Sequence, residues 1–100
     1  MLKVTALYGH PTDTAQFERY YADVHLPIFR KMAGVERSEA ARVVGTPDGS
    51  APPYYRIFEF WLVSQEQLQR SLSSPEGQAV VSDLPNFASG GATVLISKIG

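Results

Sequence analysis

The segment Tyr54–Val63 is the feature that most restricts the fold of this 100-residue chain. Five of the eleven aromatic residues fall within Tyr54–Trp61. Aromatic and β-branched residues favour strands, and alternate residues of a strand point to opposite faces of a sheet. In this segment both sets of alternate residues are largely apolar. The pattern therefore predicts a sheet strand with both faces covered.

The rest of the chain divides into alternating strand and helix patterns. Asp13 and Gln16 have the spacing of a helix start, and Pro27 predicts that this helix ends or kinks near His25–Pro27. Ser64 and the pair Ser74–Pro75 predict a second helix in two pieces. The remaining strands are expected at residues 2–8, 40–44 and 92–99.

The resulting order, βαββαβ, predicts an α+β fold of the ferredoxin-like type, with a four-stranded antiparallel sheet and helices on one face. We expect one domain over residues 1–100. The other face of the sheet is too apolar to stay exposed in a monomer, so we expect a second copy to cover it in a homodimer.

Composition excludes several classes of function. There is no cysteine, and the net charge is −1. The first fact excludes a disulfide scaffold and a thiol nucleophile, and the second disfavours binding to nucleic acid or to a membrane surface. No targeting or membrane-spanning pattern is visible, so we expect a cytoplasmic protein. Glycine-rich nucleotide motifs and metal-ligand spacings are absent, so no cofactor and no metal are expected.

Three segments together resemble the signatures of the EthD family of small dimeric α/β-barrel proteins. They are Tyr8 to Pro27, Phe60 to Ser64, and Asp83 to Gly91. The family takes its name from ethyl tert-butyl ether degradation in aerobic bacteria. The resemblance implies a ferredoxin-like protomer, a barrel-forming dimer and a pocket between helices and sheet. It also implies a small-molecule step in an aerobic degradation or oxidoreductase pathway.

His25 is the candidate catalytic residue. Its place near the break at Pro27 suggests a helix C-terminus, where the helix dipole raises the pKa of an imidazole. It is interpreted either as a general acid or base facing a pocket or as a cap for free carbonyl groups. The resemblance favours the first, because related methylmuconolactone methylisomerases use the matching His in proton transfer. Phe60 stands where their pocket has a Cys, which weighs against the same isomerase chemistry. His10 is expected in an exposed loop.

An apolar pocket with a few polar tips is the usual form of a small-molecule site. Each aromatic residue can equally serve in core or dimer packing. The candidate substrate-binding residues are Tyr8, Phe17, Tyr21, Phe60 and Trp61.

Three functions remain open from the sequence. The first is isomerisation, cyclisation or cofactor-free oxidation of a small apolar or aromatic compound. The second is a non-catalytic accessory protein that binds such a compound for a pathway oxygenase. The third is RNA binding, because RNA-recognition domains share the βαββαβ order. The strand around Phe58 lacks the glycines of that motif, which disfavours the third.

Overall fold

The computed structural model describes residues 1–100, and four antiparallel strands form its single sheet. The strands are β1 (Leu2–Tyr8), β2 (Arg37–Arg42), β3 (Arg56–Leu62) and β4 (Ala92–Lys98). Their order across the sheet is β2-β3-β1-β4, so the first strand lies in the interior of the sheet. This arrangement is the ferredoxin-like fold that the sequence predicts.

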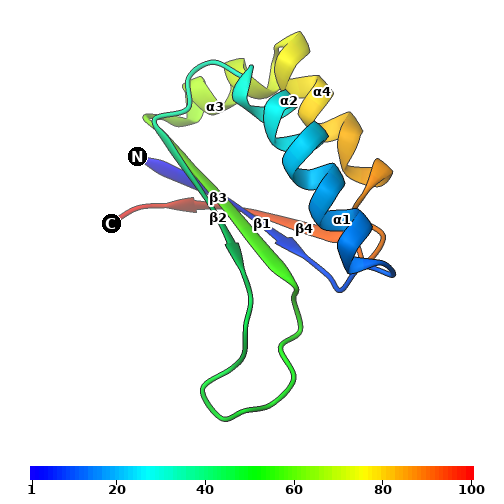
Figure 1. The fold of residues 1–100 in the computed structure, drawn as a ribbon. Helices are drawn as coiled ribbons and strands as arrows, with labels where there is room; N and C mark the ends of the chain where they lie inside the picture. Colours follow the sequence, from blue (N-terminus) through cyan, green and yellow to red (C-terminus); the bar gives the residue numbers. More distant parts are fainter.

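All helices lie on one face of the sheet, as Figure 1 shows. No helix is both long and apolar enough to cross a membrane. Between β1 and β2 the chain forms one continuous helical segment, and between β3 and β4 a broken one. The first comprises α1 (Thr14–Tyr20), a π-helical turn (Tyr21–His25) and α2 (Leu26–Arg30). The second comprises α3 (Gln65–Ser73), α4 (Pro75–Asp83) and a 3₁₀ turn (Leu84–Asn86).

The helix starts follow the capping residues that the sequence shows. The Asp13 carboxylate accepts the backbone N–H of Gln16 at 3.0 Å, and Ser64 Oγ accepts that of Gln67 at 3.1 Å. Ser74 Oγ accepts the N–H of Gly77 at 3.0 Å, and Pro75 follows it at the start of α4. Each cap satisfies a backbone donor that has no partner within its helix. The predicted division of the second helix at Ser74 is therefore confirmed.

The edge strand β2 differs from its prediction. It spans Arg37–Arg42 rather than residues 40–44, and all of its side chains are exposed. Its bounds follow from pairing with β3, in which Arg37 lies opposite Trp61 and Arg42 opposite Arg56. A strand defined by backbone pairing alone leaves no hydrophobic alternation in the sequence. The connection from β2 to β3 projects away from the body of the molecule (Figure 1).

The core lies between the helices and the inner face of the sheet. Val4, Ala6 and Tyr8 of β1 and Phe58, Phe60 and Leu62 of β3 are buried there. The outer face has a mixed character. Leu7, Ile57 and Trp61 are partly exposed on it, and Lys3 forms a 3.0 Å ion pair with Glu59 at its centre. Coverage of this face by a second copy stays a prediction.

Candidate functional site

The π-helical turn Tyr21–His25 gives His25 its position. Here the N–H of Leu26 bonds to the carbonyl oxygen of Tyr21, one residue further back than in an α-helix. Pro27 has no N–H to donate, so an α-helix would lose one backbone hydrogen bond here, and the wider turn lies at this point. The helix then continues to Arg30. The break predicted near His25–Pro27 therefore takes the form of a wide turn within one helical segment, and His25 is not at a helix C-terminus.

The wide turn directs His25 into the protein, where it meets Asp83 at the end of α4. The imidazole is 3% exposed, and its Nδ1 lies 2.9 Å from Asp83 Oδ2. Its ring lies 4.4 Å from that of Phe87 and stacks at 5.8 Å on that of Tyr21. The side chain therefore bonds to a carboxylate, and the interpretation of His25 as a cap for helix carbonyls is not supported.

Asp83 is held from two further sides. The Tyr20 hydroxyl donates to Oδ1 at 2.6 Å, and the Asn86 amide donates to the same oxygen at 3.1 Å. Burial raises the pKa of this carboxyl, but the bonds from Tyr20, His25 and Asn86 outweigh burial and hold the pKa below its usual range. Asp83 is therefore ionised at neutral pH.

The electrostatic effect on His25 is opposite to the one predicted from the sequence. Burial lowers the pKa of the imidazole, and the bond and charge of Asp83 offset this only in part. The neutral ring donates its Nδ1–H to Asp83, which leaves the lone pair on Nε2. A neutral imidazole oriented by a carboxylate is a proton acceptor, and the carboxylate stabilises the imidazolium that forms.

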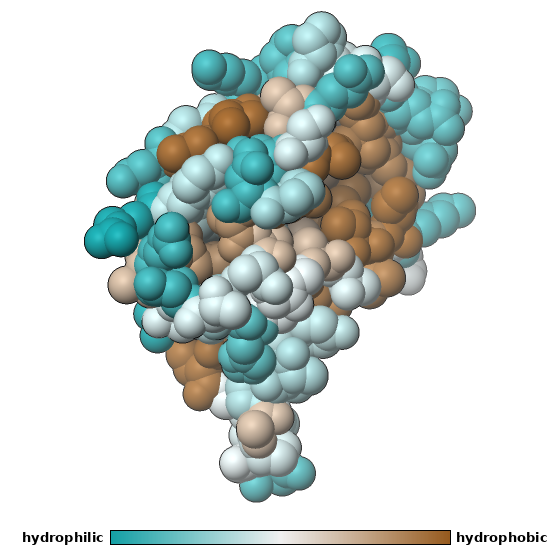
Figure 2. Space-filling model, turned by 90° about the vertical axis from the view of Figure 1, so that its right-hand side faces the viewer, coloured by the Kyte–Doolittle hydropathy of each residue, from teal (hydrophilic) through white to brown (hydrophobic).

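A cavity of about 250 Å³ lies between the sheet, α2 and α4. His25 is the one non-hydrophobic residue among its lining. Val81, Val94 and Ile96 line it and are each about half exposed, so the cavity is open on the side of α4 and β4. Figure 2 shows hydrophobic side chains gathered on one flank of the molecule. The residues that line the cavity are Val4, Ala6, Tyr8, His25, Phe29, Met32, Phe58, Phe60, Leu72, Val80, Val81, Leu84, Val94 and Ile96.

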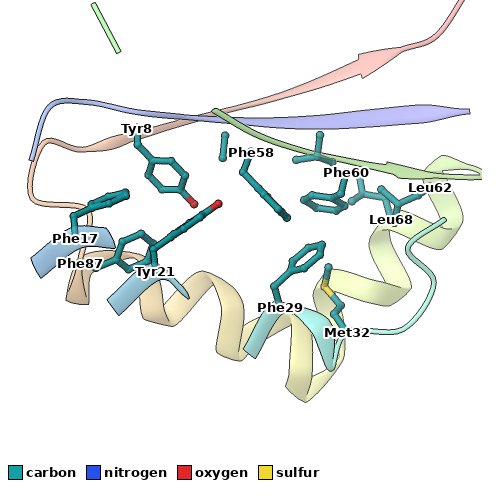
Figure 3. Packing of buried hydrophobic residues seen from close by; sticks show 12 residues of the cluster. Tyr8, Phe17, Tyr21, Phe29, Met32, Phe58, Phe60, Leu62, Leu68 and Phe87 are labelled. Carbon is teal, nitrogen blue, oxygen red and sulfur yellow. The ribbon is translucent and has the colours of Figure 1, made fainter. Parts of the chain in front are cut away.

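Tyr8, His25 and Phe60 are the sequence-predicted site residues that line this cavity. Phe17 and Tyr21 lie behind them in an aromatic cluster with Tyr8 and Phe87, where ring centroids are 5.3 to 5.8 Å apart. Figure 3 shows this cluster at one end of the core, with Phe29 and Phe60 further along it. Edge-to-face and offset-stacked aromatic pairs each contribute about 0.5–1.5 kcal/mol beyond their buried area. Phe17 is 2% exposed and packs within this cluster.

Trp61 lies on the other side of the sheet. Because consecutive strand residues point to opposite faces, Phe60 and Trp61 do not share one cavity. The Arg37 guanidinium lies 4.1 Å from the centroid of the Trp61 ring. The structure thus places Trp61 on the outer face, away from His25.

Arg56 and His10 also have partners within the chain. Arg56 Nε donates to Glu18 at 3.1 Å, and the guanidinium lies 5.0 Å from the centroid of the Tyr21 ring. His10 is exposed, and its Nε2 lies 2.8 Å from the carbonyl oxygen of Pro52. No three His, Asp or Glu side chains form a cluster that could hold a metal ion.

Asp83, Tyr20 and Asn86 are the site residues that sequence reasoning missed. The only signal was a carboxylate next to the apolar residues Val80, Val81 and Leu84. A carboxylate at such a position needs partners when it is buried. Asp83 also lies in the segment Asp83 to Gly91, which carries part of the family resemblance.

The comparisons with known proteins agree with this fold. The family described as "EthD domain" matches residues 9–91. An uncharacterised 11.0 kDa protein in the thcB–thcC intergenic region of Rhodococcus erythropolis is 35% identical over 97 residues, covering 97% of this chain and 93% of that protein. The crystal structure of an ethyl tert-butyl ether degradation (EthD) family protein from Bacillus halodurans is 32% identical. It has a TM-score of 0.92 over 100% of this chain and 99% of that one.

A more distant neighbour shares the fold alone. SnoaB from Streptomyces nogalater, a cofactor-independent oxygenase, matches with a TM-score of 0.66 at 15% identity, over 98% of this chain and 90% of the SnoaB chain.

Proposed function

The chain belongs to the EthD domain family, and on this premise we propose that it binds a small apolar or aromatic compound in the cavity and that His25 transfers a proton to or from it. The observation that carries the proposal is the neutral imidazole of His25, bonded to the ionised Asp83, at the wall of an otherwise apolar cavity. We assign the compound to an aerobic degradation or oxidoreductase pathway.

The size and lining of the cavity define the ligand class. A cavity of about 150 Å³ lined by aliphatic and aromatic side chains is large enough for benzene. The larger space of about 250 Å³ suits a compound with one or two rings. Burying a charged group against such a lining is unfavourable without a partner. A neutral ligand therefore fits best.

The proton step follows from the geometry of His25. Its Nε2 takes a proton from a carbon or hydroxyl of the ligand, and the bonding electrons stay on the ligand as an enolate or phenolate. The carboxylate of Asp83 stabilises the imidazolium through Nδ1. In isomerisation, His25 returns the proton to another carbon, so atoms and electrons balance within the ligand. Cofactor-free oxidation begins with the same step and uses dioxygen as the oxidant.

The fold neighbour SnoaB supports oxidation as one member of this set, because it is a cofactor-independent oxygenase. An accessory protein that binds the compound without changing it is the alternative.

A probe with an acidic C–H bond tests the proton step without knowledge of the natural ligand. 2-Indanone is a two-ring ketone of suitable size, and in D₂O its α-hydrogens exchange through the enolate, which NMR follows. We expect the protein to accelerate this exchange. His25→Asn is expected to reduce the acceleration by about 10²–10⁴-fold, the usual contribution of a general acid or base. His10→Asn, which alters the exposed imidazole, is expected to retain it.

The binding alternative gives a different result. If 2-indanone binds to the wild-type protein and exchanges no faster than with His25→Asn, then the proton-transfer role is wrong and the accessory function is favoured. Binding to the wild-type protein is measured on the same sample from the chemical shifts of the His25 ring.

A further inference from the structure

Ala6 has the smallest side chain in the lining of the cavity. Of the residues that line it, only this one ends at its Cβ. Side chains at alternate positions of a strand share one face, and the neighbours of Ala6 on the buried face of β1 are Val4 and Tyr8. The middle of β1 therefore carries a short side chain between two larger ones, and the cavity lies above it.

Strand pairing places Ala6 between a buried wall and the opening of the cavity. Across the sheet it lies opposite Phe58 of β3 on one side and opposite Val94 of β4 on the other. Directly opposite residues of antiparallel strands point to the same face, with Cβ atoms about 4.5–5.5 Å apart. Phe58 is buried, whereas Val94 is half exposed where the cavity opens. A ligand that enters past Val94 therefore meets Ala6 before it reaches Phe58.

His25 faces the same part of the sheet from the helical side. Tyr21 and Phe29 come about one helical turn before and after it. Both pack on Phe58, with ring centroids 6.5 Å away for Tyr21 and 4.7 Å away for Phe29, and Figure 3 shows both rings directed toward the sheet. His25 lies between them on the helical segment and lines the same cavity, so its imidazole faces the Phe58–Ala6 pair. The space above Ala6 is therefore next to the proton acceptor.

We propose that Ala6 determines the size of the ligand that reaches His25, because the space above its methyl group admits a second fused ring. This inference deepens the proposed function and rests on its assignment of the cavity as the ligand site. A larger side chain at position 6 would occupy that space itself. The chain therefore takes a ligand of two fused rings, whereas a variant with a bulkier residue here takes a single ring.

Two ketones that differ by one fused ring test this role. 2-Indanone is cyclopentanone with a benzene ring fused to it, so the two probes share the carbonyl group and the acidic C–H bonds. Binding of an apolar group becomes more favourable as it buries more apolar area. We expect the wild-type protein to bind 2-indanone more tightly than cyclopentanone, as measured by isothermal titration calorimetry.

The variant Ala6→Ile fills the space with a β-branched residue, which suits a strand. It is expected to weaken 2-indanone binding by about tenfold or more, because extra carbon atoms forced into a filled space are strongly unfavourable. It is expected to retain the affinity for cyclopentanone, which fits in the space that remains. Ala6→Val adds fewer atoms and is expected to change the affinity ratio in the same direction by less.

Ala40→Ile is the matched control. Ala40 of β2 lies opposite Phe58 on the side away from Ala6, and it points to the same face of the sheet. It is exposed and does not line the cavity. The same substitution at this position is expected to leave the affinities for both ketones unchanged.

The melting temperature without ligand provides a second measurement. Where open space lies above residue 6, the added carbon atoms of Ala6→Ile make contacts that a void does not supply. The variant is therefore expected to melt at the same or a higher temperature than the wild-type protein, as cavity-filling substitutions commonly do. A lower melting temperature, or failure to fold, would show that residue 6 is closely packed and would overturn the role of Ala6.

The binding results distinguish a wrong role for Ala6 from a wrong ligand site. If the wild-type protein binds both ketones and Ala6→Ile keeps their affinity ratio, or loses both affinities equally, Ala6 does not determine ligand size and the cavity remains the ligand site. Wild-type binding of cyclopentanone alone also overturns the role of Ala6. If the wild-type protein binds neither ketone, the cavity is not the ligand site, and the proposed function fails together with the role of Ala6.

Discussion

His25 and Asp83 are separated by 58 positions in the sequence and are joined by a 2.9 Å hydrogen bond inside the protein. Each residue comes from a different helical segment, and each lies where that segment changes its geometry: His25 ends the π-helical turn, and Asp83 precedes the 3₁₀ turn. The pair therefore ties the two helical segments together at the wall of the cavity. Its titration links the stability of the fold to the proposed chemistry.

The stability of the protein is expected to fall on mild acidification. The pKa of His25 is lowered below its ordinary value of 6.5 by burial, so the unfolded chain binds a proton more readily than the folded one just below that pH. The stabilising contribution of His25 is complete above pH 6.5 and is lost as the pH falls toward the pKa of the folded state. Urea denaturation at intervals between pH 7.5 and 5 measures this change in the free energy of unfolding.

Two histidine variants identify the residue that causes this pH dependence of the free energy of unfolding. His25→Asn is expected to flatten the pH dependence in this window, and His10→Asn is expected to retain it because His10 is exposed. Asp83, whose pKa lies below 3.8, loses its contribution only at lower pH, as the pH falls through its folded pKa. A slope that persists in His25→Asn would contradict this assignment.

Asp83→Asn is expected to lower the pKa of His25 further. The carboxylate raises that pKa through its hydrogen bond and its charge, and a neutral amide removes the charge. The Tyr20 phenol provides a second readout, since its bond to Asp83 raises its pKa and the variant returns that pKa toward 10.0. NMR titration of the imidazole and ultraviolet titration of the phenols measure the two shifts. Asp23→Asn, an exposed carboxylate in the same turn as His25, is the matched control.

The outer face of the sheet is expected to form a homodimer. Light scattering after size exclusion should give twice the chain mass of 11.0 kDa. Trp61→Glu places a charge on that face and is expected to yield monomers, because a buried unpaired charge is strongly unfavourable. Ala79→Glu adds the same charge to the exposed surface of α4 and should leave the dimer intact. A monomeric wild-type protein at micromolar concentration would rule out the dimer.

Gly77 is expected to tolerate no side chain. An added Cβ there would collide with the carbonyl oxygen of Ser71 and would lie 2.8 Å from the Cα of Leu72. Gly77→Ala should therefore reduce the free energy of unfolding by about 1–3 kcal/mol, the usual cost of overpacking. Gly45→Ala is the control, because nothing lies within 4 Å of its added Cβ. Equal stabilities of the two variants in urea denaturation would show that α3 and α4 can move apart.

Signals between residues close in the sequence predicted the fold. The features that the sequence did not reveal depend on contacts between residues far apart in the chain. Capping at Ser64 and Ser74 depends on residues three positions away, so it is readable from the chain. The partner of His25 is not, because nothing near either residue indicates that the helical segments meet there. The prediction of a raised pKa for His25 was wrong for the same reason. Burial by other elements lowers this pKa, and the position of His25 along its own helix does not reveal that burial.

The cavity was predicted in kind and only partly in place. An aromatic helix face opposite an aromatic strand indicated a space lined by Phe17, Tyr21, His25 and Phe60. His25 and Phe60 line the cavity, whereas Phe17 and Tyr21 pack against other rings beside it. Which apolar residues remain unopposed depends on how the helices sit on the sheet, and the hydrophobic pattern does not record that.

The interior position of β1 has a consequence for how the chain reaches this structure during synthesis. Both neighbours of β1 lie far along the sequence: Thr5 and Glu59 already differ by 54 positions, and β4 comes later still. The first strand to leave a ribosome therefore has no pairing partner until β3 emerges, and its second edge stays open until β4 follows. Pairing over such distances slows folding, because long loops must close before any contact stabilises them. Until then, the edges of β1 are open to strands of other nascent chains.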